Sequence, residues 1–330
     1  MRCAPAKWAE QNVDGNSGQQ LPGGGGQAGK PAADTFVQDS NANKVDILII
    51  NDNSASMDEE QQKMSTRFNS FVSDLKGLDY RIAMTTTDID SPKYGLSGRI
   101  VTWADTAAKV LTPSTPNAEA KFKKTIVRTE TIGCTLRDDC PSKDEQPLKA
   151  IELAVDQSKT ANKEFFREGV DFVAVVLSDE DELSTAPSNA TTAAYVVDHF
   201  KNLFGDTKRF AVHGLIVVPN DKVCLRAQSL QGPEGSKAAY GTRVASLAGL
   251  TKGSVNSICD ADYAKDLASI SSEVRKLVSS FELRGTPVTD SVRVALTPTF
   301  QTTWTTEGNR LIFTPAPPAG TKIEVTYSYE

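Results

Sequence analysis

Three short and almost uninterrupted apolar runs constrain the fold of this chain more than any other feature. They cover residues 45–50, 170–177 and 210–218. A continuous apolar run of this length is typical of a parallel strand that is covered on both faces. Helical patterns separate the runs, and strands that alternate with helices indicate an open sheet with helices on both faces. The sequence therefore predicts an α/β fold with a doubly wound, mostly parallel sheet.

The helical segments place an apolar side chain at every third or fourth position. The clearest is residues 262–281, where the apolar positions step by fours and threes from Tyr263 to Phe281. Other segments repeat the pattern, or the strand pattern, less strongly. We predict further helices over 58–77, 117–130, 147–158, 191–204 and 241–249, and further strands over 80–87, 98–104 and 253–258.

The composition changes after Phe281, where β-branched residues alternate with polar ones between turn signals. Residues 284–330 are predicted to form a small all-β, β-sandwich-like module of about four strands. We expect residues 34–44 to add a strand to this module, so that the α/β domain covers 45–283. Residues 1–33 are rich in Gly, Gln and Pro and read as a flexible tether.

The bulk properties exclude some classes of partner. The net charge is −6, from 36 basic and 42 acidic residues, which argues against nucleic acid as a partner. No apolar run reaches the roughly 18 residues of a transmembrane helix. Cys3, at the start of the tether, resembles the lipid-modified cysteine of a bacterial lipoprotein, which predicts a lipid anchor there.

The other four cysteines fit no zinc-binding spacing. Their simplest arrangement is two disulfides, Cys134–Cys140 and Cys224–Cys259. That pairing favours an extracytoplasmic location, at a bacterial cell surface or in the periplasm. The alternative is buried reduced thiols, since free cysteine is a common core residue.

Polar residues stand directly behind two of the apolar runs. Asp52, Ser54 and Ser56 occupy alternate positions after the first run, and Asp179 ends the second. In open α/β sheets, ligands bind outside the carboxyl ends of the strands, where the strand order reverses. Two carboxylates with nearby hydroxyls form an all-oxygen site that suits magnesium, calcium or manganese.

A plainer interpretation competes with the metal site. Ser56 and Glu59 fit a capping box for the next helix, which would leave Asp52 and Ser54 to satisfy backbone donors. The acidic run 179–182 likewise either binds further cations or is a solvated loop in which only Asp179 matters. The position of Asp52 directly after a buried strand, together with Asp179, favours the metal site.

The segments "DILIINDNSASM" and "VAVVLSDEDE", with the final helical pattern, resemble the von Willebrand factor type A domain and its metal-ion-dependent adhesion site. The resemblance is to the bacterial surface branch and covers residues 45–283. It implies a Rossmann-like fold in which Ser54 and Ser56 bind the ion through their hydroxyls, and Asp52 and Asp179 bind it directly or through water. A loop threonine normally completes the set, for which Thr135 is favoured and Thr131 and Ser142 are alternatives.

The resemblance also implies a function. Such domains are similar to receptors in which a divalent cation, most often magnesium, captures an acidic group of a protein or glycan ligand. We therefore expect a non-catalytic adhesion protein. One alternative is a magnesium-dependent phosphohydrolase, although such enzymes place a second aspartate where this chain has Ser54. Another is a periplasmic or surface assembly scaffold.

Overall fold

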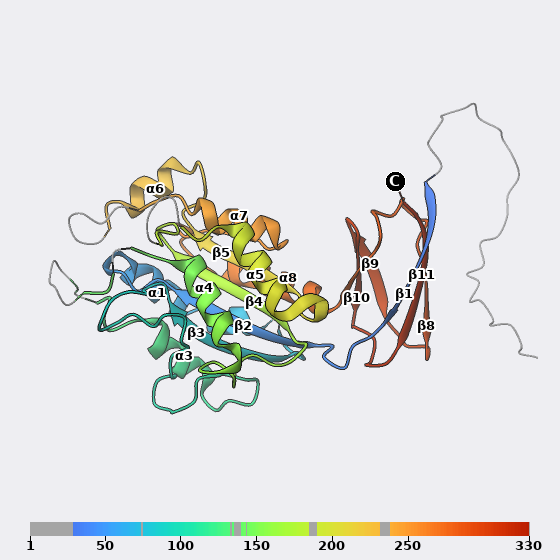
Figure 1. Cartoon of the computed structure of the whole chain (residues 1–330), viewed down its shortest axis with the longest axis horizontal. Helices are drawn as coiled ribbons and strands as arrows, with labels where there is room; N and C mark the ends of the chain where they lie inside the picture. Colours follow the sequence, from blue (N-terminus) through green and yellow to red (C-terminus); the bar gives the residue numbers. More distant parts are fainter. Residues whose placement is uncertain are drawn as a thin grey trace, which may run out of the picture.

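A computed structural model describes residues 29–329, apart from residues 74, 133, 135–139, 143, 185–189 and 232–237 and the side chain of Asp206. The chain forms two parts, an α/β unit (residues 44–278) and a β module (residues 30–37 and 280–329) (Figure 1). None of the described helices is both long and apolar enough to cross a membrane.

The α/β unit is built on a five-stranded sheet in the order β3-β2-β4-β5-β6, in which every pairing is parallel. This confirms the predicted fold class. Three of the strands contain the apolar runs, because a central parallel strand is covered on both faces. The strands are β2 (Lys44–Asn51), β3 (Asp79–Thr86), β4 (Asp171–Ser178), β5 (Phe210–Ile216) and β6 (Val255–Ser257).

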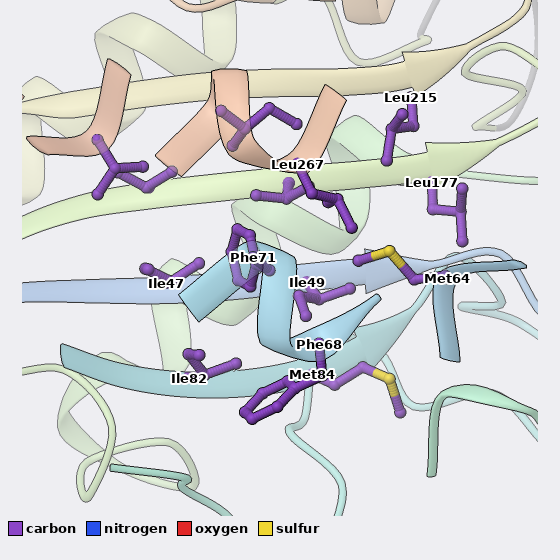
Figure 2. Close-up of a cluster of buried hydrophobic side chains, with 14 of the residues drawn as sticks. Ile47, Ile49, Met64, Phe68, Phe71, Ile82, Met84, Leu177, Leu215 and Leu267 are labelled. Carbon is purple, nitrogen blue, oxygen red and sulfur yellow. The ribbon is translucent and has the colours of Figure 1, made fainter. Parts of the chain in front are cut away.

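Helices cover both faces of the sheet. The strand period of two divides β2 between two cores, with Ile47 and Ile49 in one and Leu48 and Ile50 in the other. Figure 2 shows the first core, where Phe68 and Phe71 lie over the sheet. The helices are α1 (Asp58–Ser65), α2 (Phe68–Ser73), α3 (Ala118–Ile126), α4 (Pro147–Asp156), α5 (Ala193–Phe204), α6 (Lys222–Gln228), α7 (Thr242–Leu250) and α8 (Ala264–Val278), with short 3-10 turns at Ala55–Met57, Gln157–Lys159 and Gly205–Thr207.

In the α/β unit two sequence predictions differ from the structure, and one helix was not predicted. The single helix expected over 58–77 is two helices, because the chain turns between Ser65 and Phe68. Residues 98–104 form no strand, since this segment bonds to β3 only at isolated points such as Val101 N to Met84 O (2.9 Å). Its apolar pattern reflects burial against the sheet. Helix α6 was not predicted, because its seven residues are too short to show a periodicity.

The β module stacks two three-stranded antiparallel sheets, ordered β1-β11-β8 and β7-β10-β9. Leu311, Phe313, Ile323 and Val325 are buried between them. The strand from the amino-terminal side runs from 30 to 37, so it begins earlier than the expected 34–44. The strands are β1 (Lys30–Val37), β7 (Ser280–Glu282), β8 (Arg293–Thr297), β9 (Thr303–Glu307), β10 (Arg310–Thr314) and β11 (Lys322–Tyr329).

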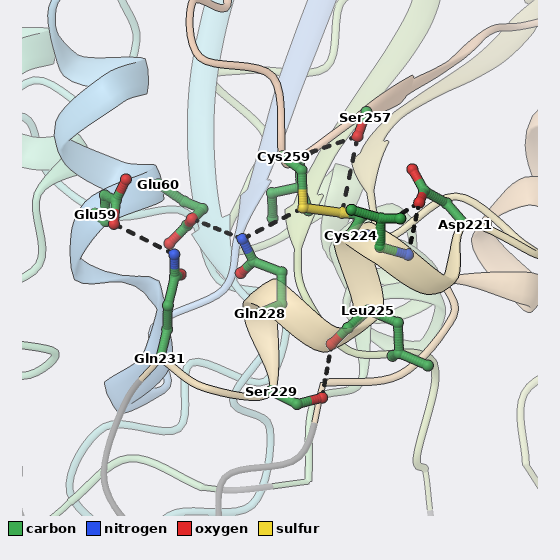
Figure 3. The surroundings of a disulfide bond; sticks show 12 residues. Glu59, Glu60, Asp221, Cys224, Leu225, Gln228, Ser229, Gln231, Ser257 and Cys259 are labelled. Carbon is green, nitrogen blue, oxygen red and sulfur yellow. Dashed lines mark hydrogen bonds between the residues drawn. A yellow bond between two sulfur atoms is a disulfide. The ribbon is translucent and has the colours of Figure 1, made fainter.

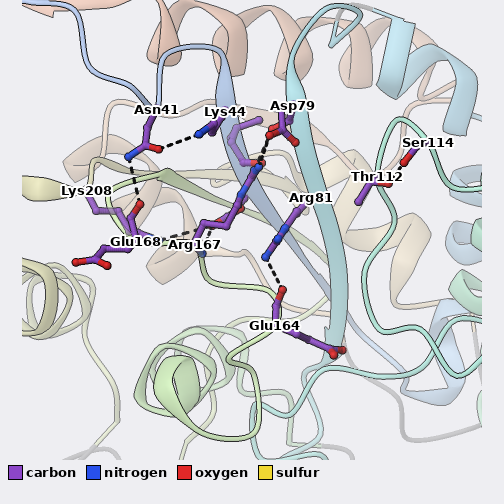
Figure 4. A network of polar contacts seen from close by, with 12 residues as sticks. Asn41, Lys44, Asp79, Arg81, Thr112, Ser114, Glu164, Arg167, Glu168 and Lys208 are labelled. Carbon is purple, nitrogen blue, oxygen red and sulfur yellow. Dashed lines mark hydrogen bonds and ion pairs between the residues drawn. The ribbon is translucent and has the colours of Figure 1, made fainter. Parts of the chain in front are cut away.

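A buried ion-pair network closes the amino end of the parallel sheet (Figure 4). Asp46 on β2 is fully buried, and its carboxylate accepts hydrogen bonds from the backbone N–H (2.8 Å) and the Nε (2.7 Å) of Arg167. The ammonium of Lys208 lies 3.7 Å from the same carboxylate. Burial raises the pKa of Asp46, and the charge of Arg167 opposes that rise. The protein thus supplies its own cations to this carboxylate.

Candidate metal centre at the carboxyl end of the sheet

The strand order reverses between β2 and β4. From β2 the chain crosses to β3 on one side, and from β3 it returns to β4 on the other side of β2. The crevice outside the carboxyl ends of such a strand pair is the usual ligand site of a doubly wound sheet. The residues that follow β2 and end β4 therefore belong to one place in the fold.

Asp52 is fixed at this crevice by both of its neighbours. Its backbone N–H donates to the carbonyl of Leu177 on β4 (3.0 Å), which extends the strand pairing by one residue. One carboxylate oxygen accepts from the N–H of Ser54 (2.8 Å) and the other from the hydroxyl of Ser178 (2.6 Å). Burial raises the pKa of Asp52 to about 6, although these hydrogen bonds oppose the rise.

The two serines and the second aspartate converge beside it. The hydroxyls of Ser54 and Ser56 lie 3.1 Å apart, and the hydroxyl of Ser56 lies 3.2 Å from Oδ1 of Asp179. The other oxygen of Asp179 is buried and has no hydrogen-bond partner among the described residues. The capping box does not form, since α1 begins after Met57 and no side chain caps it. Ser56 instead faces Asp179.

The three candidates for the loop ligand have different positions. Thr131 is buried, and its hydroxyl donates to the carbonyl of Asn53 (2.9 Å) and accepts from Gln61 (3.2 Å). It therefore supports the backbone of the segment from Asp52 to Ser56, which we call the serine loop. Ser142 accepts from the N–H of Asp144 (3.0 Å) within a local turn. Thr135 lies outside the described residues.

Gln61 fixes the position of the serine loop by hydrogen bonds. Its side-chain nitrogen donates to the carbonyl of Asp52 (2.7 Å), and its side-chain oxygen accepts from the N–H of Arg128 (2.7 Å). The fully buried amide thereby ties the residue after β2 to the segment after α3. Sequence reasoning missed Gln61, because it reads as one more polar position on an exposed helix face.

Two further carboxyl groups, Glu145 and Glu180, lie beside the aspartates. Glu145, in the loop before α4, is 1% exposed, and one of its oxygens has no hydrogen-bond partner among the described residues. Burial and the neighbouring charge of Asp52 raise the pKa of Glu145 well above its usual range, and that of Glu180 to about 8. The sequence gives no signal for Glu145, because several acidic residues occupy the same loop.

The acidic run after β4 is not a solvated loop, which corrects that interpretation. Glu182 is 1% exposed and accepts from the N–H groups of Leu148 (2.6 Å) and Lys149 (3.2 Å), at the start of α4. Asp181 accepts from the N–H of Arg243 (2.9 Å), at the start of α7. Both carboxylates therefore satisfy the free N–H groups of helix N-termini, where negative charge is favoured.

Two disulfides are present, Cys134–Cys140 and Cys224–Cys259. The second joins Cys224 in α6 to Cys259 in the segment after β6 (Figure 3). From the same helix Gln228 donates to Glu60 of α1 (3.0 Å). The disulfide thus fixes α6 to the segment after β6, and the hydrogen bond from Gln228 connects α6 with α1. Cys3 lies outside the described residues.

The arrangement offers a divalent cation oxygen ligands only. Among the described residues no three carboxylate, imidazole or thiol groups converge as a metal site, so the serine hydroxyls would have to supply part of any coordination. The residues fit such an ion in two respects. A buried carboxylate oxygen of Asp179 lacks a partner, and the hydroxyls of Ser54 and Ser56 lie next to it. Hydroxyl and carboxylate oxygens suit magnesium, calcium or manganese.

Comparison with protein-family models gives no match, and neither does comparison with curated proteins. Among solved structures, the pilus adhesin SpaC from Lactobacillus rhamnosus GG is similar over 92% of this chain, with 10% identity and a TM-score of 0.39. Human COPII-coat protein Sec24c is similar over 90%, with 10% identity and a TM-score of 0.38. The chain covers 41% of each of these proteins.

An aerotolerance-related membrane protein from Bacteroides fragilis is similar over 70% of this chain and 98% of its own, with 13% identity and a TM-score of 0.34. At these identities and TM-scores, the likenesses assign neither a family nor a function.

Proposed function

We propose that this chain is a non-catalytic binding protein of the von Willebrand factor A type, in which a divalent cation captures an acidic group of a partner. One observation carries the proposal. Asp52 and Asp179 are buried with two serine hydroxyls between them, and no described lysine, arginine or histidine forms an ion pair with either aspartate. A buried carboxylate without a counter-charge is costly, and a cation removes that cost.

The residues divide the work between them. Ser54, Ser56, Asp52 and Asp179 would hold the ion, most often magnesium, and the fifth ligand would come from the loop that contains Thr135. Ser178 and the N–H of Ser54 orient the Asp52 carboxylate by hydrogen bonds. Gln61 and Thr131 fix the backbone of the serine loop. When bound, the cation supplies a positive position for an outside carboxylate.

The surroundings of the site favour a protein ligand over a glycan. Ile132 follows Thr131 and is 49% exposed, and Leu183 follows the acidic run and is 43% exposed. Exposed apolar side chains contribute more than half of the contact area in typical protein–protein interfaces. We infer that the partner presents an aspartate or glutamate flanked by apolar side chains.

The proposed location is extracytoplasmic, because two disulfides persist in oxidising compartments. Counting free thiols in the protein isolated from its native host tests this. Cys134, Cys140, Cys224 and Cys259 should be oxidised, and free thiols at these four positions would contradict the location.

Calorimetry tests the metal site directly. Chelator-treated protein should bind one Mg²⁺ or Mn²⁺ ion per chain. The Asp52→Ala substitution should abolish the heat of cation binding. Asp198→Ala is the matched control, because Asp198 is an exposed aspartate on α5. Equal cation binding by the wild type and Asp52→Ala would overturn the proposal.

A second assay separates binding from catalysis. The protein is incubated with an aryl phosphate and Mg²⁺, and no turnover above the Asp52→Asn variant is expected. Turnover that depends on Asp52 would assign the site to a phosphohydrolase. Retention of partners from host extract in Mg²⁺, but not in chelator or with Asp52→Ala, supports the receptor function.

A further inference from the structure

A cavity of about 670 Å³ lies between the α/β unit and the β module, far from the candidate metal centre. Its walls come from the connection after β1, the chain from α5 to β5, the end of α7, the junction of α8 with β7, and Arg310 on β10. Small-molecule sites in proteins range over roughly 300–1,000 Å³ and occur preferentially where domains meet. Both the size and the place of this cavity are those of a ligand site.

The cavity carries positive charge in a protein of net charge −6. Its described lining includes five cationic and three acidic side chains. Two of the cations are neutralised locally, since Arg209 pairs with Asp171 (2.5 Å) and Lys252 pairs with Glu282. Lys201 and Arg310 form no ion pair with a described residue. A concave surface with one sign of charge attracts ligands of the opposite sign.

Lys208 adds to this positive charge from inside the wall. The residue is 5% exposed, and its ammonium has no hydrogen-bond partner among the described residues. Its nearest anion is Asp46, 3.7 Å away, which already accepts two hydrogen bonds from Arg167. Asn41 also lines the cavity. Lys208 lines the cavity, and salt screens a buried charge less than an exposed one.

Part of the remaining wall is apolar. Phe200 and Phe210 stack with ring centroids 4.6 Å apart on the side of the α/β unit, and Phe281 provides an aromatic surface on the side of the β module. Val197 and Leu277 complete this surface. A ligand that fits therefore has an apolar body and a negative head.

We propose that this cavity binds a small amphiphilic anion, in which an apolar body carries a carboxylate or a phosphate. Lys201 and Arg310 receive the head group, and the phenylalanines receive the apolar body. The proposal is independent of the metal centre, and its binding persists in chelator and in Asp52→Ala.

Isothermal titration with decanoate and decyl phosphate, below their micelle concentrations, tests the proposal and distinguishes the two head groups. Both probes should bind with a stoichiometry of one, and acetate and decanol should bind at least about tenfold more weakly, because each lacks one half of the ligand. No saturable binding of either anion by the wild-type chain would overturn the proposal.

Variants locate the binding. Lys201→Glu with Arg310→Glu should weaken decanoate binding about tenfold, because two attractive charges become repulsive. Lys123→Glu is the matched control, since Lys123 is an exposed lysine on α3 and should leave the affinity unchanged. Val197→Trp fills the cavity and should block both probes while the circular dichroism stays native. Equal affinity in the control, the charge variant and the filled variant would place the probe elsewhere and refute the site.

Discussion

A buried aspartate lies at each end of strand β2, but the charges around the two carboxylates differ. Asp46 lies at the amino end and Asp52 directly after the carboxyl end, and both are fully buried. Asp46 is held by Arg167 and Lys208, whereas Asp52 faces hydroxyls and further carboxyl groups. Burial costs both carboxylates their hydration. The amino end thus has its counter-charges within the fold, whereas the carboxyl end has none among the described residues and fits the proposed cation.

Removal of Arg167 should have the largest effect. Arg167→Ala leaves Asp46 buried beside Lys208 alone and should lower the free energy of unfolding by about 3–5 kcal/mol. Asp52→Asn should leave the stability of the metal-free protein unchanged or higher, because it removes a buried charge without a counter-ion. Urea denaturation in chelator measures both, with Arg226→Ala, an exposed arginine, as the control. A similar loss in both variants would remove the contrast between the two ends.

Added cation should produce the next largest effect. At a Mg²⁺ concentration of 100 times the dissociation constant, the free energy of unfolding should rise by about 2.7 kcal/mol, because only the folded chain assembles the site. Asp179→Asn should lose this gain, and Asp198→Asn should keep it. Thermal or urea unfolding with and without Mg²⁺ measures the difference. Stabilisation that survives in Asp179→Asn would point to a cation site elsewhere.

The pH dependence of the metal-free protein should follow the carboxyl end. Burial raises the pKa of Asp52 from 3.8 to about 6 and that of Glu180 from 4.5 to about 8, so the folded state holds protons that the unfolded state has released. Stability in chelator should therefore fall as the pH rises from about 4 to about 8. Saturating Mg²⁺ should flatten this slope. Stability that rises over the same range without metal would contradict the arrangement.

Thr131→Val should have the smallest effect. The hydroxyl bridges Asn53 and Gln61, so its loss should lower stability by about 1 kcal/mol. Because the structure assigns this hydroxyl to the backbone, the affinity for Mg²⁺ should change by less than about threefold. Calorimetry on the variant decides, and a loss of affinity as large as that of Ser54→Ala would make Thr131 the loop ligand.

The architecture of the sheet was readable from the sequence, because central parallel strands must be apolar on both faces. The apolar runs that contain Ile47, Val173 and Val212 were predicted as such strands, and they pair in parallel in the sheet. Residues 98–104 show the limit of this reasoning. Ile100 and Trp103 are buried, with 3% and 1% exposure, so the segment has the composition of a strand. It lacks the regular backbone hydrogen bonds that define a strand.

Part of the candidate site was also readable. Asp52, Ser54 and Ser56 share one short stretch, and Asp179 ends the next strand of the sheet, so position along the chain places them together. Glu145 and Gln61 reach the same place from a loop and from a helix, and their roles depend on tertiary packing. Glu182 shows the converse. Its place in an acidic run suggested a solvated side chain, but it is buried and accepts hydrogen bonds from two backbone N–H groups.

The pairing of β1 with β11 has a mechanical consequence. Their antiparallel register sets Lys30 opposite Tyr329 and Val37 opposite Lys322. A pulling force applied between residues 30 and 329 would break the hydrogen bonds between the two strands one after another. A force between residue 30 and a ligand at the metal centre would instead run along β1 into β2 through covalent bonds. Force spectroscopy with handles in these two geometries should give a lower rupture force for the first than for the second.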